Sequence, residues 1–299
     1  MTLPLHRHEF QAMASHCEVV LAGVDSAAEA EHLTTLAVQE VLRIEHKYSR
    51  YRPFSLLSRI NAHSGPVVCD EETLDLLDKA QLLHAHSTGL FDITCGVLRR
   101  AWDFKAARVP HADEIAALLP LIGMSGIERE GNQVRLRTPG MELDFGGFGK
   151  EYAADRAATL LAEAGVTHGY VNLAGDLRVI GPKPDGSPWT IGIRHPRDAA
   201  RLLASIPVSA GALATSGDYE RYFEQNGRRY CHVLNPRTGQ PAAYWQSVSV
   251  LAPSTLIAGA FTTIAMLLEE QALPFLRSTG LSFLAVDHSG MLHQESTHA

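Results

Sequence analysis

The chain has 299 residues, of which 45% are hydrophobic and 20% are charged. That composition is typical of a globular protein, and the length suffices for one large domain or two fused halves. The formal net charge of −7 argues against a nucleic-acid-binding surface, because such surfaces need clustered lysine and arginine.

The four cysteines form no CxxC pair, which argues against a zinc site and against a disulfide framework. The N-terminal residues show neither the apolar run of a signal peptide nor a lipobox cysteine. No stretch approaches the length of about 18 apolar residues that a membrane span requires. We therefore expect a cytoplasmic protein without a membrane span. The cysteines, which we interpret as reduced thiols, are Cys17, Cys69, Cys95 and Cys231.

The first half of the chain predicts one strand and three helices. Residues 17–24 form a short apolar run of the kind found in strands. Residues 27–49 carry an apolar stripe at helical spacing, and Pro53 breaks the helix that this stripe predicts. A second amphipathic helix is predicted over 71–88, and a shorter one over 110–119.

The second half of the chain combines strands with two helices. Residues 131–150 predict a hairpin that turns at Pro139-Gly140, and a helix over 150–165 opens directly after it. An apolar helix is predicted over 254–270. Antiparallel runs with helices set between them favour an α+β fold. The strand-like runs cover residues 168–181, 188–196, 201–209, 246–254 and 281–294.

A glycine-rich loop precedes the predicted helix at Lys150. Asp144 leads into it, and Gly146, Gly147 and Gly149 allow the backbone to turn tightly. Free N–H groups at a helix start, beside a lysine, suit a phosphate or pyrophosphate. The spacing is not GxGxxG, and no ribose-binding acid follows about 20 residues later. Anion binding and a plain strand-to-helix turn with a surface lysine therefore both remain open for this motif.

Five further polar residues stand out, and three of them, Asp92, Asp176 and His232, have a structural alternative. Asp92 lies in an apolar run, where a turn cap is the more common role. Asp176 follows a kink of small residues that could be a tight turn. Thr215 and Ser216 offer two hydroxyls, and His232 precedes an Asn-Pro turn, although a single histidine is more often structural. The absence of a GxSxG motif argues against a serine-hydrolase triad.

These segments, in this order, resemble the FAD:protein FMN transferases, the ApbE-type family. The resemblance runs from Ala12 to Met266. It implies an α+β, T-fold-like architecture, in which 1–299 form one domain of two related, intertwined halves with FAD in the cleft between them. The most specific segments are YRPFSLLSRIN, GLFDIT, LDFGGFGKEYAADRA, VNLAGDL, TSGDYERYF and CHVLNPRTG.

The resemblance also implies which residues bind FAD. Met13 and Tyr51 would contact the flavin or its sugar chain, and the segment from Leu90 to Asp92 would receive the adenosine end. The two segments around Ser216 and His232 would close the site. The full set implied to contact FAD is Met13, Tyr51, Leu90, Phe91, Asp92, Asp144, Lys150, Thr215, Ser216 and Leu234.

By the same resemblance, a magnesium ion lies against the FAD pyrophosphate and polarises it. Its ligands in the family are the backbone of the glycine loop, here Gly147, and an Asp and a Thr on the late helix. The candidate threonines are Thr262 and Thr263, but Gly259 stands where the family has the Asp. The loss matters because a hard divalent cation prefers anionic oxygen ligands.

The reaction that the resemblance implies begins at His232. This histidine would act as the base that takes the proton from a threonine hydroxyl of an acceptor flavoprotein, AMP would leave, and FMN would stay on the threonine. Two other functions remain open. The chain could bind FAD without transferring FMN, or it could be an FAD pyrophosphatase that releases FMN and AMP.

Overall fold

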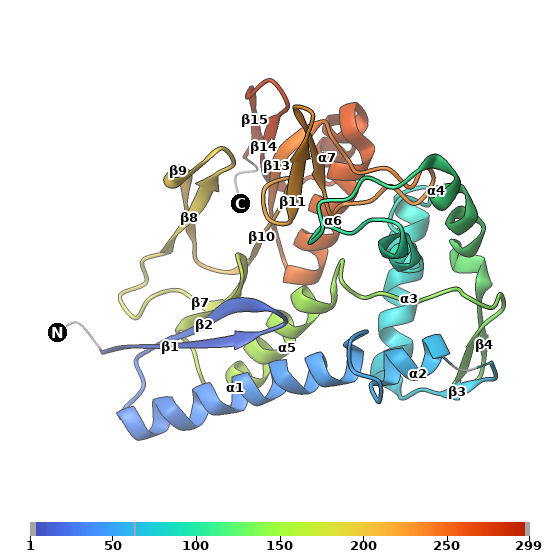
Figure 1. Ribbon diagram of the computed structural model, residues 1–299. Helices are drawn as coiled ribbons and strands as arrows, with labels where there is room; N and C mark the ends of the chain where they lie inside the picture. Colours follow the sequence, from blue (N-terminus) through green and yellow to red (C-terminus); the bar gives the residue numbers. More distant parts are fainter. Residues whose placement is uncertain (1–3, 63, 297–299) are drawn as a thin grey trace.

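The computed structural model describes residues 4–62 and 64–296. Its largest element is an antiparallel sheet with the strand order β1-β2-β6-β7-β10-β13-β14-β15 (Figure 1). The strands are β1 (Leu5–Ala12), β2 (Ser15–Ala22), β6 (Gly169–Leu173), β7 (Asp176–Gly181), β10 (Gly211–Gly217), β13 (Trp245–Ala252), β14 (Ser282–Asp287) and β15 (Leu292–Glu295). The mixture of this sheet with helices confirms the expected α+β class.

The sheet is built from two halves that repeat the same order of elements. Strands β1 and β2 are followed by helices and then by β6 and β7, and strands β10 and β13 are followed by helices and then by β14 and β15. The halves join where β7 pairs with β10. The helices that directly follow the first strand pair or precede the second are α1 (Ala27–Tyr48) and α5 (Gly149–Glu163) in the first half, and α6 (Thr255–Leu268) with α7 (Ala272–Ser278) in the second.

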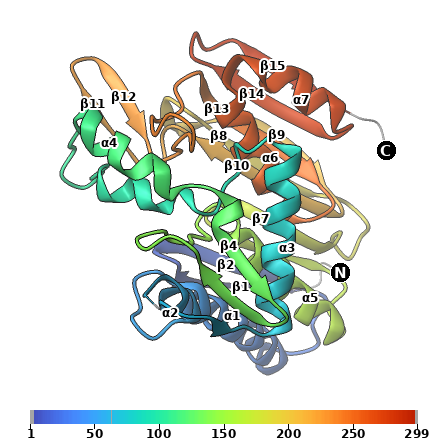
Figure 2. The same cartoon turned by 90° about the vertical axis from the view of Figure 1, so that its right-hand side faces the viewer.

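Further elements surround this framework (Figure 2). The helices α2 (Leu56–Ala62), α3 (Glu71–His86) and α4 (Ala112–Leu118) lie between α1 and α5 in the chain. The strands β3 (Val67–Val68), β4 (Ile127–Glu130) and β5 (Gln133–Leu136) form one small sheet. Two hairpins complete the set: β8 (Trp189–His195) with β9 (Asp198–Val208), and β11 (Tyr222–Gln225) with β12 (Arg228–Cys231).

The predicted helices agree with the structure to within a few residues, because local signals define their ends. The side chain of Ser26 caps α1 by accepting a hydrogen bond from the backbone of Glu29 at 3.2 Å. The side chain of Asp70 caps α3 in the same way, on the backbone of Thr73. Short runs with weak periodicity, such as β1 and α2, were not predicted.

The predicted hairpin with a turn at Pro139-Gly140 is wrong. The hairpin is instead β4–β5, which turns at Gly131-Asn132, and residues 141–145 form no strand. The reason is a contact from far away in the sequence. The side chain of Asn61 accepts from the N–H of Leu143 at 2.7 Å and donates to its carbonyl at 2.9 Å, in place of a neighbouring strand.

The expectation that no stretch is apolar enough to span a membrane also needs correction. The helical stretch Thr255–Ser278 is long and apolar enough by length and composition, with a mean hydropathy of 1.3 over its best window. Because 56% of that window is buried inside the fold, the stretch is weak support for a span. Among the described residues it is the one helical stretch that passes this test.

Helices α5 and α6 pack closely in the centre of the molecule (Figure 1). Small side chains stand on both helices here: Ala153 and Ala157 of α5 share one core cluster with Ala260 of α6. Small residues allow two helix backbones to approach each other. This contact brings the start of α5 next to the first turns of α6, where Lys150, Thr262 and Thr263 lie among the predicted site residues.

Candidate active site

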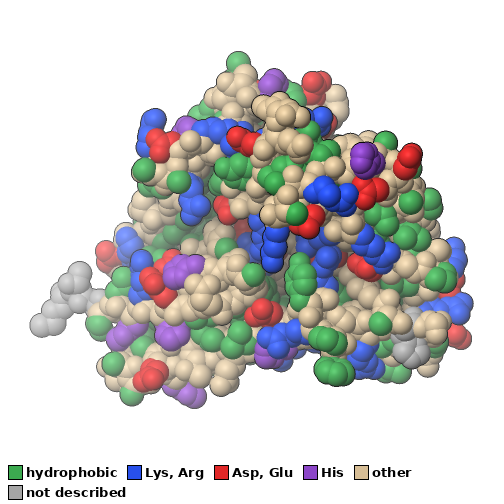
Figure 3. Space-filling view, viewed as in Figure 1, with side chains coloured by type: hydrophobic (Ala, Val, Ile, Leu, Met, Phe, Trp, Pro, Cys, Tyr) green, Lys and Arg blue, Asp and Glu red, His purple; other side chains and the backbone are tan. Residues whose placement is uncertain are grey.

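Lys and Arg side chains gather near the middle of the face shown in Figure 3. The start of α5 follows the glycine loop, and no side chain caps its first turn. The uncapped N–H groups of a first helical turn favour an anionic ligand. The uncapped start of α5 therefore supports the interpretation of this motif as a phosphate site, and phosphate binding stays a prediction.

Asp144, a predicted FAD contact, is the centre of a small network of ion pairs. Its carboxylate lies 3.0 Å from Nη1 of Arg50 and 3.5 Å from Nη2 of Arg99. It also accepts a hydrogen bond from the N–H of Gly146 at 2.9 Å. Asp144 thus holds the glycine loop and two arginines in place, and neither arginine was predicted from the sequence.

Lys150, also a predicted FAD contact, links α5 to the turn between β6 and β7. Its ammonium group donates to the carboxylate of Asp176 and to the carbonyl of Leu173, the latter at 3.1 Å. Burial alone would lower the pKa of Lys150, but the carboxylates of Asp176 and Glu151 raise it above its ordinary value. The lysine is therefore a fixed positive charge beside the glycine loop.

The segment from Leu90 to Asp92 is buried beside the glycine loop. The carboxylate of Asp92 caps a local turn, since it accepts hydrogen bonds from the N–H of Thr94 at 2.8 Å and from its hydroxyl at 2.5 Å. The ring of Phe91 packs against that of Phe148, with centroids 5.8 Å apart. Asp92 thus has the turn-cap role that the sequence left open. Its contact with FAD stays a prediction.

Met13 and Tyr51 lie on loops at different depths. Met13 sits in the tight β1–β2 turn with a positive φ of 52° and packs partly against the core. The ring of Tyr51 is 76% exposed and lies over the guanidinium of Arg50, 5.2 Å from ring centroid to Cζ. An exposed aromatic ring beside the Arg50–Asp144 pair is available to stack on a planar ligand.

Hydroxyl groups from β10 and α6 form a cluster. The hydroxyl of Ser216 lies 2.8 Å from that of Thr262 and 3.4 Å from that of Thr263. Thr262 donates to the carbonyl of Gly259 at 2.9 Å. The hydroxyl of Thr215 pairs with that of Ser249 at 2.8 Å, away from this cluster. The structure thus brings together two predicted metal ligands, Thr262 and Thr263, and one predicted FAD contact, Ser216.

His232 is partly buried, and its Nδ1 is a buried atom without a hydrogen-bond partner. Burial and the positive charges of Arg221, Arg99 and Lys150 lower the pKa of His232 to about 4. The imidazole is therefore neutral near neutral pH, and one of its two nitrogens can accept a proton. Arg99 and Lys150, which contribute to this shift, also pair with Asp144 and Asp176 at the glycine loop and at the β6–β7 turn.

Leu234 follows closely in the chain, and its side chain is buried. It belongs to a core cluster with Trp102 and Phe223. The indole N–H of Trp102 donates to the carbonyl of Gly239 at 2.8 Å, which fixes the turn after His232. Leu234 therefore has a packing role, and its contact with FAD stays a prediction.

The sequence reasoning missed Glu151, which lies on α5 beside Gly259. The residue is 7% exposed, and its Oε2 is buried without a hydrogen-bond partner. Burial and the negative charge of Asp176 raise the pKa of Glu151. An acidic residue inside the small-residue segment KEYAADRAA was the one sequence signal that could have identified it.

Oxygen donors dominate the space between α5, β10 and α6. They are the carboxylates of Glu151 and Asp176 and the hydroxyls of Ser216, Thr262 and Thr263. Gly147 lies half-buried in the turn just before α5. Within the described residues no group of three or more His, Cys, Asp or Glu could hold a metal. A magnesium ion nevertheless fits this donor set, because it prefers oxygen ligands and often retains waters.

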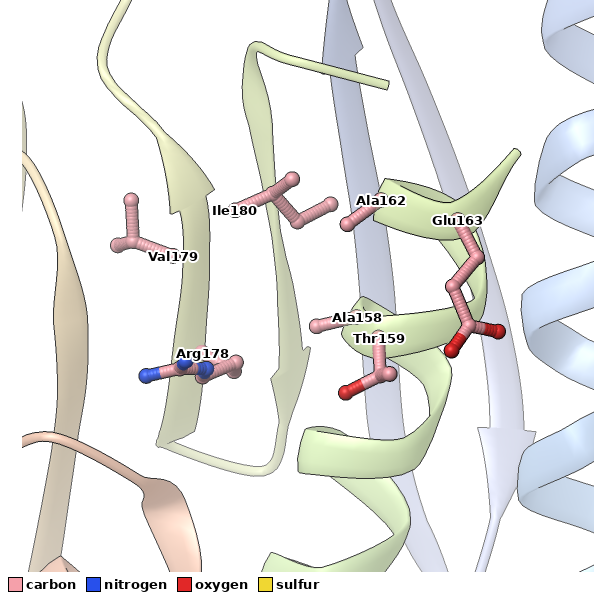
Figure 4. A pocket seen from close by; sticks show the side chains of 7 residues that line it. All are labelled: Ala158, Thr159, Ala162, Glu163, Arg178, Val179 and Ile180. Carbon is pink, nitrogen blue, oxygen red and sulfur yellow. The ribbon is translucent and has the colours of Figure 1, made fainter. Parts of the chain in front are cut away.

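A separate pocket of about 380 Å³ lies farther along α5 (Figure 4). Its cationic side chain, Arg178, approaches Asp155 at 3.7 Å and donates to the carbonyl of Pro253. Among the residues that line it, the pocket therefore offers no uncommitted positive charge for a nucleotide, and we place the candidate site at the start of α5. The pocket is lined by Ala158, Thr159, Ala162, Glu163, Arg178, Val179 and Ile180.

Comparisons with known proteins agree on one family. The model of the ApbE family matches residues 13–285. An FAD:protein FMN transferase of Vibrio cholerae is 33% identical over 253 residues, which cover 82% of this chain and 75% of that protein. One of Klebsiella pneumoniae is 30% identical over 293 residues, which cover 94% of this chain and 83% of that protein.

Solved structures agree with this match. The ApbE protein of Thermotoga maritima superposes with a TM-score of 0.91 at 30% identity and covers 98% of each chain. The apo form of the flavinyl transferase ApbE of Pseudomonas stutzeri superposes with a TM-score of 0.87 at 28% identity, covering 98% of this chain and 95% of that one. Relatives of this chain are thus transferases by name, and the chain itself belongs to the ApbE family.

Proposed function

We propose that this protein is an FAD:protein FMN transferase that moves FMN from FAD to a threonine hydroxyl of an acceptor flavoprotein and releases AMP. The names of its relatives support the transfer of a flavin nucleotide. The single observation in the structure that carries the proposal is His232. It is a neutral imidazole with an unpartnered nitrogen, close to the positive charges beside the glycine loop.

Different residues of the site would bind different parts of FAD. The uncapped start of α5 and the ammonium of Lys150 attract the pyrophosphate of FAD. The arginines that flank Asp144 add positive charge, and the exposed ring of Tyr51 would stack on a planar part of FAD. FAD carries a pyrophosphate for the start of α5 and a planar ring for Tyr51, whereas FMN has no pyrophosphate.

The chemical step needs one proton transfer and one displacement. His232 takes the proton from the threonine hydroxyl of the acceptor, whose oxygen then attacks the phosphorus of the FMN half of FAD. The bond from that phosphorus to the AMP oxygen breaks, and AMP carries away the electron pair. Bound magnesium would withdraw charge from the pyrophosphate, and Glu151, Thr262, Thr263 and the backbone of Gly147 are its candidate ligands.

The test is incubation of the protein with FAD, Mg²⁺ and an acceptor peptide that contains the target threonine. The intact mass of the peptide should rise by that of FMN less one water, and AMP should appear in equal amount. A peptide with alanine in place of the threonine should stay unmodified. His232→Ala should retain FAD binding and lose roughly 10² to 10⁴-fold in rate.

Other outcomes would replace the proposal. Free FMN and AMP without peptide modification would assign an FAD pyrophosphatase, the second function that the sequence left open. FAD binding without any turnover, at any Mg²⁺ concentration, would assign a flavin-binding protein of the same fold.

A further inference from the structure

We propose that Glu151 supplies the carboxylate ligand of a divalent cation in the space that Gly259 leaves open, so that the anionic ligand stands on α5 and not on α6. The magnesium dependence is part of the proposed function, on which this assignment rests. Glu151 would be the residue that supplies the negative charge for the ion in this chain.

The first observation is steric. A Cβ atom placed on Gly259 would lie 2.5 Å from Cγ of Glu151 and 2.9 Å from its Oε1. Real Cβ atoms essentially never approach other heavy atoms that closely. The side chain of Glu151 thus fills the volume that any side chain at 259 would need. Glutamate at 151, in this position, therefore requires a residue without a side chain at 259.

The second observation is the unused bonding capacity of the carboxylate. Oε2 of Glu151 is buried without a hydrogen-bond partner, although the residue is 7% exposed. A buried carboxylate oxygen without a partner is costly unless it binds something. Asp176 stands nearby as a second buried carboxylate, and Lys150 is bonded to Asp176. Lys150 thus pairs with one of two neighbouring acidic groups, and a divalent cation would supply the positive charge that the other lacks.

The third observation is the position of the neighbouring hydroxyls. Thr262 donates its proton to the carbonyl of Gly259, so Ser216 is the donor in the contact between Ser216 and Thr262. Lone pairs of Ser216 and Thr263 therefore remain to accept or to coordinate. These oxygens adjoin the same turn of α6 that Glu151 contacts. Two carboxylates and hydroxyl oxygens are the donor set of a hard divalent cation.

The experiment measures metal binding directly, with Mn²⁺ as the paramagnetic probe and Mg²⁺ as the competitor. Free Mn²⁺ is counted by electron paramagnetic resonance in titrations with and without FAD. Compared with the wild type, Glu151→Gln should bind Mn²⁺ at least about tenfold more weakly. The matched control is Glu163→Gln, which neutralises an exposed glutamate on the same helix and should leave Mn²⁺ binding unchanged.

Melting curves recorded without metal distinguish a merely structural role of Glu151 from a role in metal binding. Glu151→Gln keeps the size of the side chain and removes a charge whose burial and repulsion by Asp176 raise the pKa of Glu151, so its melting temperature without metal should equal or exceed that of the wild type. Addition of Mn²⁺ should then raise the melting temperature of the wild type and not that of the variant.

A second pair of variants moves the carboxylate between helices. Gly259→Asp alone should weaken Mn²⁺ binding and lower the melting temperature, because the new side chain meets Glu151. The double variant Glu151→Ala with Gly259→Asp removes that obstacle and should recover Mn²⁺ binding. Mn²⁺ binding that is recovered in the double variant and not in Gly259→Asp would support the proposal that residue 151 carries the carboxylate in place of residue 259.

The proposal is overturned if the wild type binds no Mn²⁺ with or without FAD, or if Glu151→Gln binds it as tightly as the wild type. Failure of FMN transfer with Glu151-dependent Mn²⁺ binding intact would refute the proposed function and leave this inference standing.

Discussion

His232 should make the stability of the protein depend on pH in the mildly acidic range. Its pKa is lowered from 6.5 to about 4 by burial and by nearby positive charges. The unfolded chain therefore binds a proton in that range that the folded protein does not bind, so the free energy of unfolding falls as the pH falls. The full effect is about 3 kcal/mol, and about 2 kcal/mol of it is lost between about pH 7 and about pH 5.

The measurement is urea unfolding across that range for the wild type, His232→Gln and the control His32→Gln. Glutamine cannot titrate, while His32 is exposed on α1 and serves as a control for the loss of a histidine. All other groups are common to the three proteins, so the difference in slope isolates His232. The wild type and the control should lose about 2 kcal/mol more than His232→Gln. Equal losses would mean that the fold does not hold the imidazole neutral.

Three further substitutions test contacts around the site. Trp102→Phe removes the hydrogen bond to the Gly239 carbonyl and should cost about 1–3 kcal/mol in urea unfolding, whereas an unchanged midpoint would contradict that role. Lys150→Met leaves Asp176 buried without its cation and should cost about 3–5 kcal/mol, and a loss below about 1 kcal/mol would refute the pair. Tyr51→Ala should change stability by less than about 0.5 kcal/mol, because the ring is exposed. It should weaken FAD binding in a fluorescence titration, and unchanged FAD affinity would remove Tyr51 from the site.

The sequence predicted the long helices well because their signals are local. The apolar stripe of α1 and the glycine loop before α5 lie within a few turns of the elements that they define. Those rules failed for β10, which pairs in the centre of the main sheet. Its Thr215 and Ser216 interrupt the apolar pattern of a buried strand and instead bond to Ser249 and Thr262. Local rules commonly fail where a segment carries polar site residues.

Partners from distant segments could not be predicted in the same way. The resemblance identified Asp144 as a site residue, but nothing in the sequence indicated that Arg50 and Arg99 hold its carboxylate. The same holds for Asn61, whose bonds to Leu143 replace the expected hairpin. Such contacts depend on the packing of elements and become visible only when the fold is known.

Gly259 has a different meaning once its neighbour in space is known. In the sequence its missing carboxylate indicates a weakened metal site, and restoring aspartate there looks like the natural repair. In the structure the space is already occupied by Glu151, whose carboxylate oxygen has no other partner. Adding aspartate would then place a second carboxylate within van der Waals contact of the first, which costs both steric and electrostatic energy. Whether the site binds an ion thus depends on residues 151 and 259 as a pair, and Gly259→Asp in the presence of Glu151 does not by itself test whether the site has been lost.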